Sequence, residues 1–135
     1  MKSLLVNIDV PDIQAGISFY RDGLGLCFAR FLTEQVAELF LGDVVVYLLE
    51  KEEGSRACST SSTQRSYERH WTPVHLDFVV TDIRKALERA LAAGATLERD
   101  VTDHAYGKLA LLADPFGNGF CLIEFAGRGY DAIVA

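Results

Sequence analysis

Apolar and polar residues alternate along two short segments of the chain that carry nearly the same pattern. Residues 5–13 read LVNIDVPDI and residues 75–83 read HLDFVVTDI, and the two align without a gap, residue 5 on residue 75. Alternation with a period of two predicts a half-buried strand. Its recurrence at a distance predicts that one structural unit is present twice.

Each predicted strand leads into a predicted helix that begins at an aspartate. Asp12 and Asp82 stand where a carboxylate can accept the backbone N–H groups left free at a helix start. Glycines mark the expected helix ends, at 23–25 in the first copy and at Gly94 in the second. Between these limits apolar residues recur every three or four positions, which predicts one apolar face per helix: Ile13, Ile17, Tyr20 and Leu24, then Ile83, Leu87, Ala90 and Leu91.

Three further apolar runs follow each helix and predict three strands in each copy. The sequence Asp-Pro-Phe-Gly-Asn at 114–118 is typical of a hairpin turn before the last of them. We therefore expect an α+β fold with two βαβββ modules, whose curved mixed sheets enclose a cavity. The predicted strands after the helices cover 26–31, 37–41 and 44–49 in the first copy and 96–101, 109–113 and 119–125 in the second.

The organisation expected from these patterns is a single domain, 1–135. Its first module covers 1–51, its second covers 74–126, and a glycine-containing tail covers 127–135. The connecting segment 52–73 is rich in Ser, Thr, Arg and Glu and has no apolar period, which predicts a linker or a mobile lid over the cavity. A short helix at 66–71 is the alternative.

Composition narrows the class of protein. Half of the residues are hydrophobic and 24% are charged, which suits a globular core, and no apolar run reaches the ~18 residues of a membrane span. The N-terminus lacks the pattern of a secretory leader, so we expect a cytoplasmic protein without a membrane partner. The three cysteines form no C-x-x-C pair, and the net charge of −6 carries no basic stripe, so disulfides and nucleic acid are not expected.

The alternation also assigns the faces of the two opening strands. Val6 and Phe78 belong to the rows that pack under the helices, whereas Asn7, His75 and Asp77 belong to the opposite rows. That opposite face is too polar for a dry core and too apolar for a plain solvent face, which favours a pocket lining. An ordinary solvent-facing sheet surface is the alternative.

These features together resemble the vicinal oxygen chelate superfamily, which includes glyoxalase I, the bleomycin and fosfomycin resistance proteins and extradiol dioxygenases. The resemblance covers almost the whole chain and depends on the paired modules, on FYRDGLG at 19–25, on Gly94 and on DPFGN at 114–118. It implies the fold, and a homodimer that completes its cavities across a twofold axis. It implies no particular reaction, because one fold hosts many functions.

The resemblance also implies four positions for metal ligands, on the first and last strands of each module. His75 matches one of them and can donate a nitrogen. Leu5 and Val46 cannot bind a metal, and Cys121 has a sulfur where a carboxylate is usual. We therefore expect no cofactor, because a divalent cation needs several donors.

A metal could still bind if His75 were joined by Asn7, Asp77 or Asp9 from the same face. Glu124 is not expected to help, because the alternation points it away from Cys121. Without a metal, His75 is a candidate general base, a ligand-binding group or a structural hydrogen-bond partner of Asp77. For Cys121, a small buried filler is favoured over a nucleophile.

Two functions follow from these alternatives. The first is a metal-independent protein that binds a small organic ligand, as the bleomycin resistance proteins do. The second is a glyoxalase- or dioxygenase-type metalloenzyme, a lyase or isomerase, that uses His75 and a divalent metal ion, so the sequence leaves open whether the chain is an enzyme. The residues expected to contact the ligand are His75, Asn7, Asp77, Val46, Cys121, Tyr106 and His104.

Overall fold

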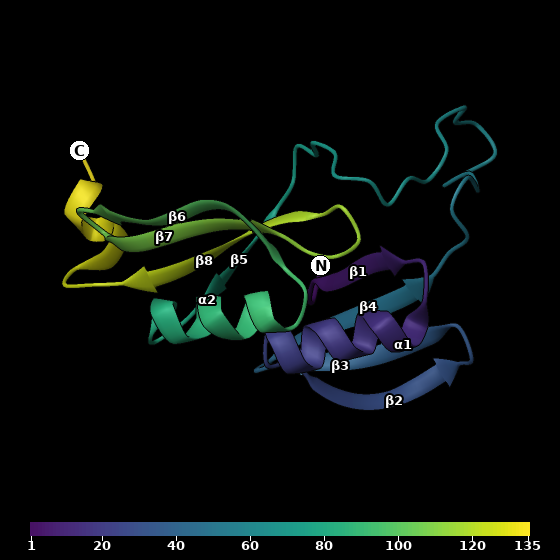
Figure 1. Cartoon of the computed structure of the whole chain (residues 1–135), viewed down its shortest axis with the longest axis horizontal. Helices are drawn as coiled ribbons and strands as arrows, with labels where there is room; N and C mark the ends of the chain where they lie inside the picture. The colour runs from purple at the N-terminus through teal and green to yellow at the C-terminus, as the bar shows by residue number, and fades with distance from the viewer. The chain divides into compact units, whose positions relative to one another are not determined.

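Each of the two repeated segments forms a strand followed by a helix, as the alternation predicts. The computed structural model describes all 135 residues and divides into two compact units, Met1–Glu68 and Arg69–Ala135 (Figure 1). Each unit holds one βαβββ module, so the α+β class and the two modules are confirmed. The boundary between the units falls inside the connecting segment 52–73.

The first module contains one four-stranded mixed sheet in the order β1-β4-β3-β2. β1 runs parallel to β4, and the remaining neighbours are antiparallel. The helix α1 continues directly into a π-helical turn, η1. The bounds are β1 Leu5–Val10, α1 Ile13–Ser18, η1 Phe19–Gly23, β2 Cys27–Thr33, β3 Val36–Leu41 and β4 Val44–Glu50.

The second module repeats this topology, with the sheet order β5-β8-β7-β6 and β5 parallel to β8. A short 3₁₀ helix, η2, follows the last strand within the tail. The bounds are β5 Leu76–Val79, α2 Ile83–Ala92, β6 Thr96–His104, β7 Gly107–Ala113, β8 Gly119–Phe125 and η2 Gly129–Ile133. No helix of the chain combines the length and the apolar character that crossing a bilayer requires.

Both helices begin as their sequences predict. Asp12 Oδ1 accepts a hydrogen bond from the Ala15 N–H at 2.7 Å, and Asp82 Oδ1 accepts one from the Lys85 N–H at 3.2 Å. These bonds satisfy donors that have no partner within the first helical turn. The N-cap roles of Asp12 and Asp82 are confirmed.

A glutamate on the last strand of each module also contacts the start of its helix. Glu50 Oε2 accepts from the Ile13 N–H and Glu124 Oε2 accepts from the Ile83 N–H, both at 2.8 Å. Glu124 therefore lies on the helix side of its sheet, as the alternation predicts. Its carboxylate stabilises a helix and is directed away from the opposite face.

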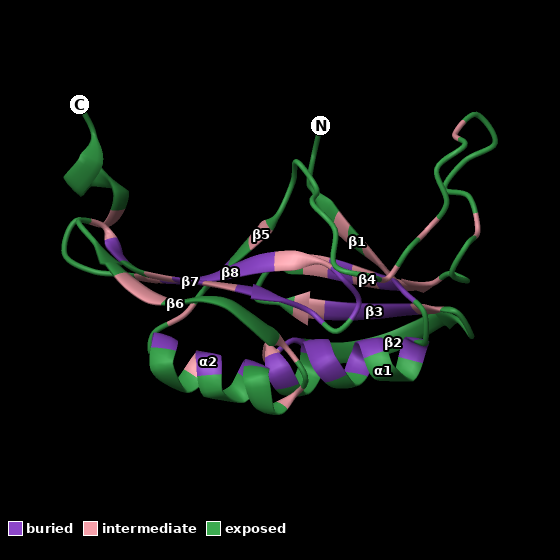
Figure 2. Ribbon diagram, turned by 45° about the horizontal axis from the view of Figure 1, so that its top comes forward, coloured by how far each residue is buried: buried purple, intermediate pink, exposed green.

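One face of each sheet packs against a helix, and buried positions face each other across that layer (Figure 2). The opposite face of each sheet, which we call the open face, is not covered by a helix of the same module. Apolar side chains in strand positions of one parity and on the inward stripe of each helix form the core. Its members with 2% exposure or less include Val10, Leu39 and Leu48 in the first module and Ile83, Leu112 and Leu122 in the second.

The hairpin turn predicted at 114–118 is held by its first residue. Asp114 is 4% exposed, and its Oδ1 accepts from the backbone N–H groups of Phe116 and Asn118 at 2.8 and 2.9 Å. Its Oδ2 accepts from the Asn118 side-chain amide at 3.0 Å. Such a turn is typical of an aspartate that satisfies the backbone two residues ahead, and the prediction is confirmed.

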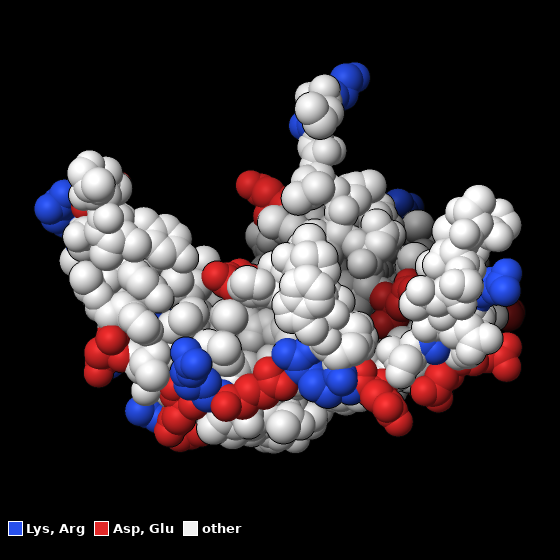
Figure 3. Space-filling model, turned by 90° about the horizontal axis from the view of Figure 1, so that it is seen from above, with Lys and Arg blue, Asp and Glu red and all other residues white.

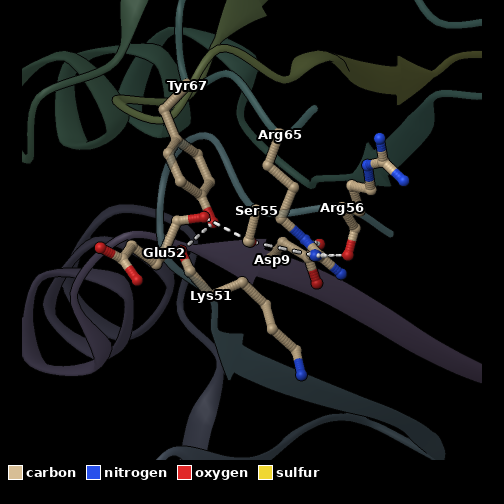
Figure 4. A network of polar contacts seen from close by, with 7 residues as sticks. All are labelled: Asp9, Lys51, Glu52, Ser55, Arg56, Arg65 and Tyr67. Carbon is tan, nitrogen blue, oxygen red and sulfur yellow. Dashed lines mark hydrogen bonds and ion pairs between the residues drawn. The ribbon is translucent and has the colours of Figure 1, made fainter. Parts of the chain in front are cut away.

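The connecting segment contains no helix at 66–71, so that alternative is wrong. In such a helix the Arg65 carbonyl would accept one of the first helical hydrogen bonds. Instead it accepts from Gly54 N at 2.8 Å, and His70 N donates to Gly117 O at 3.4 Å. Side-chain hydrogen bonds also connect the segment to the rest of the first unit (Figure 4). Arg65 Nε pairs with Asp9 Oδ2 at 2.7 Å, and Tyr67 donates to the Lys51 carbonyl at 2.6 Å.

Charged side chains of both signs are interspersed on the face shown in Figure 3. Several arginines pair with neighbouring carboxylates at hydrogen-bond distance. These pairs are Arg21 with Asp22, Arg30 with Glu38, Arg69 with Glu98, and Arg84 with Asp100.

Candidate functional site

Three of the predicted site residues meet on the open face of the second sheet. His75 directly precedes β5, Asp77 lies on β5, and Cys121 pairs with Asp77 in register from β8. His75 Nε2 lies 3.1 Å from Asp77 Oδ1. The potential ligand atoms of all three residues lie within 4.8 Å of one another. The alternation placed His75 and Asp77 on one face correctly, and Cys121, which the family resemblance added, lies beside them.

The environment of Cys121 makes its thiol a poor nucleophile. Burial raises the pKa of Cys121 to about 11, and the negative charge of Asp77 and a hydrogen bond to it act in the same direction. The thiol therefore stays protonated at neutral pH and donates a hydrogen bond to Asp77. Because the thiolate is the reactive form, this favours a packing role over a nucleophilic one.

A cavity of about 170 Å³ opens beside this cluster. That volume suits one ring, since an apolar cavity of roughly 150 Å³ can hold a benzene molecule. Trp71, at its edge, is 82% exposed. The lining comprises Arg69, Trp71, Thr72 and His75 from the connecting segment and the start of β5, Glu98 from β6, Leu111 and Leu112 from β7, and Gly119, Phe120 and Cys121 from β8.

A bidentate ion pair forms one wall of this cavity. Arg69 Nε and Nη2 donate to the two carboxylate oxygens of Glu98 at 2.6 and 2.9 Å, and Arg69 Nη1 donates to the His70 carbonyl. This pairing lowers the pKa of Glu98 and raises that of Arg69.

The backbone around this ion pair fits the arginine. Glu98 lies at a shift in register between Leu97 and Arg99, and such bulges redirect side chains. A Cβ on Gly119 would lie 2.5 Å from Arg69 Nη2, so a glycine leaves the space that the guanidinium occupies. Three segments distant in sequence thus position one side chain.

Val46 is not part of an open face. It pairs with Val6 and Leu39, is 4% exposed and faces α1. The residue that occupies the place of Cys121 in the first module is Tyr47, because Tyr47 pairs with Asn7 as Cys121 pairs with Asp77. The resemblance was matched to Val46 on the assumption that the turn before the last strand has the same length in both modules, but the turn between Leu41 and Val44 is shorter than the turn between Ala113 and Gly119.

Asn7 lies exposed on the open face of the first sheet and begins a row of polar side chains there. The row continues through Tyr47 on β4 and Glu38 on β3 to Arg30 on β2. Glu38 is 7% exposed, and its carboxylate accepts from Arg30 Nε at 2.9 Å and from the Tyr47 hydroxyl at 2.8 Å. The sequence analysis missed this network, although one glutamate inside the apolar run VAELFL was its signal.

The Glu38 network predicts a pH-dependent stability. Hydrogen bonds from Arg30 and Tyr47 hold the pKa of Glu38 below its ordinary value. A carboxyl whose pKa is lower in the folded state stabilises the fold above its unfolded pKa of about 4.3, and this contribution is lost as the pH falls further. Urea unfolding between about pH 6 and pH 3 should therefore show a steeper acid loss for the native chain than for Glu38→Gln.

The matched variant for this experiment is Tyr47→Phe, which removes one of the two hydrogen bonds and keeps the ring. It should give an intermediate slope. Equal slopes for the native chain and Glu38→Gln would contradict the assigned network.

His104 and Tyr106 lie away from the cavity. Their rings stack on each other at 4.9 Å next to the β6–β7 turn, and Tyr106 also contacts Tyr130 of η2 at 5.2 Å. Glu98 and Leu112 line the cavity from the other ends of the same two strands. The structure therefore does not bring this pair to the cluster around Cys121, because the pair lies at the opposite end of the β6–β7 hairpin.

The family resemblance raises the question of whether these residues fit a metal. Leu5 offers no donor, but Asp77 stands beside His75 and Cys121 and completes a set of nitrogen, oxygen and sulfur. Three such ligands are typical of zinc sites with an open position. The set suits a thiophilic cation better than magnesium or manganese. Binding would require Cys121 to lose its proton.

The two βαβββ modules, each with a mixed four-stranded sheet, and the polar cluster on the open face of the second define a protein of the vicinal oxygen chelate superfamily. A family model described as a glyoxalase-like domain matches residues 5–123, and the chain belongs to this family.

Solved structures share this fold over most of their length. A hypothetical protein from S. aureus is 19% identical, with a TM-score of 0.72 over 92% of this chain and 94% of its own. A glyoxalase/bleomycin resistance protein/dioxygenase family enzyme from Burkholderia phytofirmans is 22% identical, with a TM-score of 0.70 over 90% and 97%. The fosfomycin resistance protein FosX from Listeria monocytogenes is 15% identical, with a TM-score of 0.69 over 93% and 94%.

Curated relatives match over a shorter stretch. An uncharacterized protein from Mycobacterium tuberculosis is 40% identical over 52 residues, which are 38% of this chain and 31% of that protein. One from Mycobacterium bovis is 40% identical over the same length, 34% of its own. The match thus spans about a third of these relatives.

Proposed function

We propose that this chain binds a small organic molecule in the cavity of its second module and needs no metal to do so. The observation that carries the proposal is the cavity itself, where an apolar floor meets a few placed polar groups. Leu111 supplies an apolar side chain, Trp71 offers an exposed ring, and His75 with Cys121 forms a polar end. This combination is typical of small-molecule sites.

The hydrogen bonding of the polar end supports binding without a metal. Asp77 accepts from the thiol of Cys121 and lies at hydrogen-bond distance from His75, so the three groups satisfy one another. A metal would have to displace the proton of a thiol whose pKa is about 11. In the first module, Tyr47 stands in the position of Cys121 and donates to Glu38.

A second function is favoured by one specific observation. The donor atoms of His75, Asp77 and Cys121 lie within 4.8 Å of one another, which is close enough to converge on one cation after small side-chain movements. In a glyoxalase- or dioxygenase-type enzyme these residues would hold the metal. The metal would supply Lewis-acid polarisation of a substrate oxygen.

Trp71 makes the proposal directly testable, because it is the chain's single tryptophan and is 82% exposed at the cavity edge. Protein treated with a chelator is titrated with one-ring probes: benzyl alcohol, benzoate and benzylamine. We expect a saturable change and a blue shift of the Trp71 emission with at least one probe, because a bound ring shields the indole from water.

The matched control fills the cavity and leaves Trp71 in place. Leu111→Phe enlarges a lining side chain that is not fully buried, and it should abolish the saturable change. Absence of a response to every probe would contradict the proposed site. A response that appears only with added zinc or manganese, and disappears in His75→Ala, would favour the metalloenzyme.

A further inference from the structure

The charges around the second-module cavity do not cancel. Glu98 is neutralised by its two hydrogen bonds from Arg69. Asp77 has no such partner: its ion-pair contact is His75, which is charged only when protonated, and its other contact is a neutral thiol. No lysine or arginine pairs with Asp77.

The nearest arginine on the same row of the open face is also distant. That row runs from Asp77 through Cys121 and Leu111 to Arg99 on β6. Because neighbouring strands lie about 4.8 Å apart, three strand spacings put the Arg99 Cα roughly 14 Å from the Asp77 Cα. Arg99 forms no ion pair with Asp77.

The arginine that does line the cavity is poorly placed to bind an anion. Arg69 directs Nε and Nη2 to Glu98 and Nη1 to the His70 carbonyl, and it covers Gly119. Thr72 likewise donates its hydroxyl to the Val74 carbonyl at 2.7 Å. An anionic ligand would therefore find no uncommitted cation along this wall.

Trp71 and Asp77 are instead suited to a positive charge. An aromatic face attracts ammonium and guanidinium groups, most strongly for tryptophan. The side chain of Asp77 is 35% exposed on the same face, beside the two cavity residues His75 and Cys121. Asp77 is not itself part of the lining, but its carboxylate lies 3.1 Å from His75 Nε2 and within 4.8 Å of the Cys121 sulfur, and both of those residues line the cavity.

We infer that the ligand of this cavity is an organic cation, namely a single ring that carries an amine or amidine. The ring occupies the space between Trp71 and Leu111, and the charged group pairs with Asp77. This inference rests on the proposed function and adds the chemical class of the ligand.

Three probes of equal ring size test the inference by Trp71 fluorescence in the presence of a chelator. Benzylamine should bind about tenfold more tightly than benzyl alcohol, because a charge-assisted hydrogen bond is roughly twice as strong as a neutral one. Benzoate should bind most weakly. Asp77→Asn should remove this preference, so that benzylamine binds no more tightly than benzyl alcohol does.

Two further variants separate contact from general charge. Asp103→Asn removes the same charge from an exposed position on β6 and should preserve the preference for benzylamine. Glu98→Gln frees Arg69, so it should weaken benzylamine binding and strengthen benzoate binding.

The outcomes distinguish the two proposals. If the probes bind but benzyl alcohol or benzoate matches benzylamine, or if the preference survives in Asp77→Asn, the organic-cation inference is overturned and the binding site stands. If no probe binds, the proposed function fails.

Discussion

Replacement of Gly107 by alanine is expected to lower the free energy of unfolding of the second module by roughly 3 kcal/mol or more. Gly107 begins β7 with a backbone φ of +141°, a value that residues with a side chain rarely adopt. A Cβ there would lie 2.0 Å from the Glu124 carbonyl oxygen and 2.9 Å from Phe125 Cα. Both are backbone atoms of the neighbouring strand, so no side-chain rotation relieves the clash and the β7–β8 pairing must open.

The measurement is urea unfolding followed by far-UV circular dichroism, because Trp71 is 82% exposed and its emission would change little on unfolding. Gly127→Ala is the control, because Gly127 has a φ of +56° and a Cβ at this position would meet no other atom within 4 Å. It should cost only about 1 kcal/mol, which is the conformational penalty without the clash. Similar losses for the two variants would show that β8 does not approach Gly107 this closely.

Cys58 and Cys121 are expected to differ strongly in their reactivity with iodoacetamide at about pH 8. Cys58 is exposed, and hydrogen bonds from the Thr60 hydroxyl and from the backbone N–H groups of Thr60 and Ser61 lower the pKa of its thiol. Cys121 is 8% exposed and has a thiol pKa of about 11, so about one molecule in a thousand carries its thiolate at that pH. We expect Cys121 to react roughly 10- to 100-fold more slowly than Cys58, after allowance for the greater nucleophilicity of a more basic thiolate.

Mass spectrometry of the labelled peptides follows each cysteine separately. Asp77→Asn removes the charge and the acceptor that help to raise the pKa of Cys121, so this variant should label Cys121 faster and leave the rate at Cys58 unchanged. The acceleration should be partial, because burial is the larger cause of the shift. Rapid labelling of Cys121 in the native chain would contradict a protonated thiol at the polar end of the cavity and would reopen a nucleophilic role.

The ligand, its binding without a metal and the homodimer implied by the family resemblance stay predictions. The structure changes which residues should be tested for them. Tyr47 and Glu38 now represent the open face of the first module in place of Val46. Arg69, Trp71 and Glu98 join the cavity in the second module, whereas His104 and Tyr106 lie outside its lining.

The amino-acid sequence by itself determined the two modules, the order of their elements and the shared face of His75 and Asp77. These features follow from local rules: alternation along a strand, a carboxylate at a helix start and turn residues before a hairpin. His75 and Asp77 are two apart on one strand, so their shared face required no knowledge of the rest of the molecule. Cys121 joined them because the pairing of β5 with β8 preserves the parity of both strands.

The tertiary structure alone decided the register of the first sheet and the wall of the cavity. Val46 and Tyr47 are neighbours in sequence. Because the turns before β4 and β8 differ in length, Tyr47 and not Val46 occupies the position that corresponds to Cys121. The wall requires Arg69, Glu98 and Gly119 to meet from three distant segments. No local pattern encodes such a meeting, because it depends on strand pairing and on the space that a missing side chain leaves between strands.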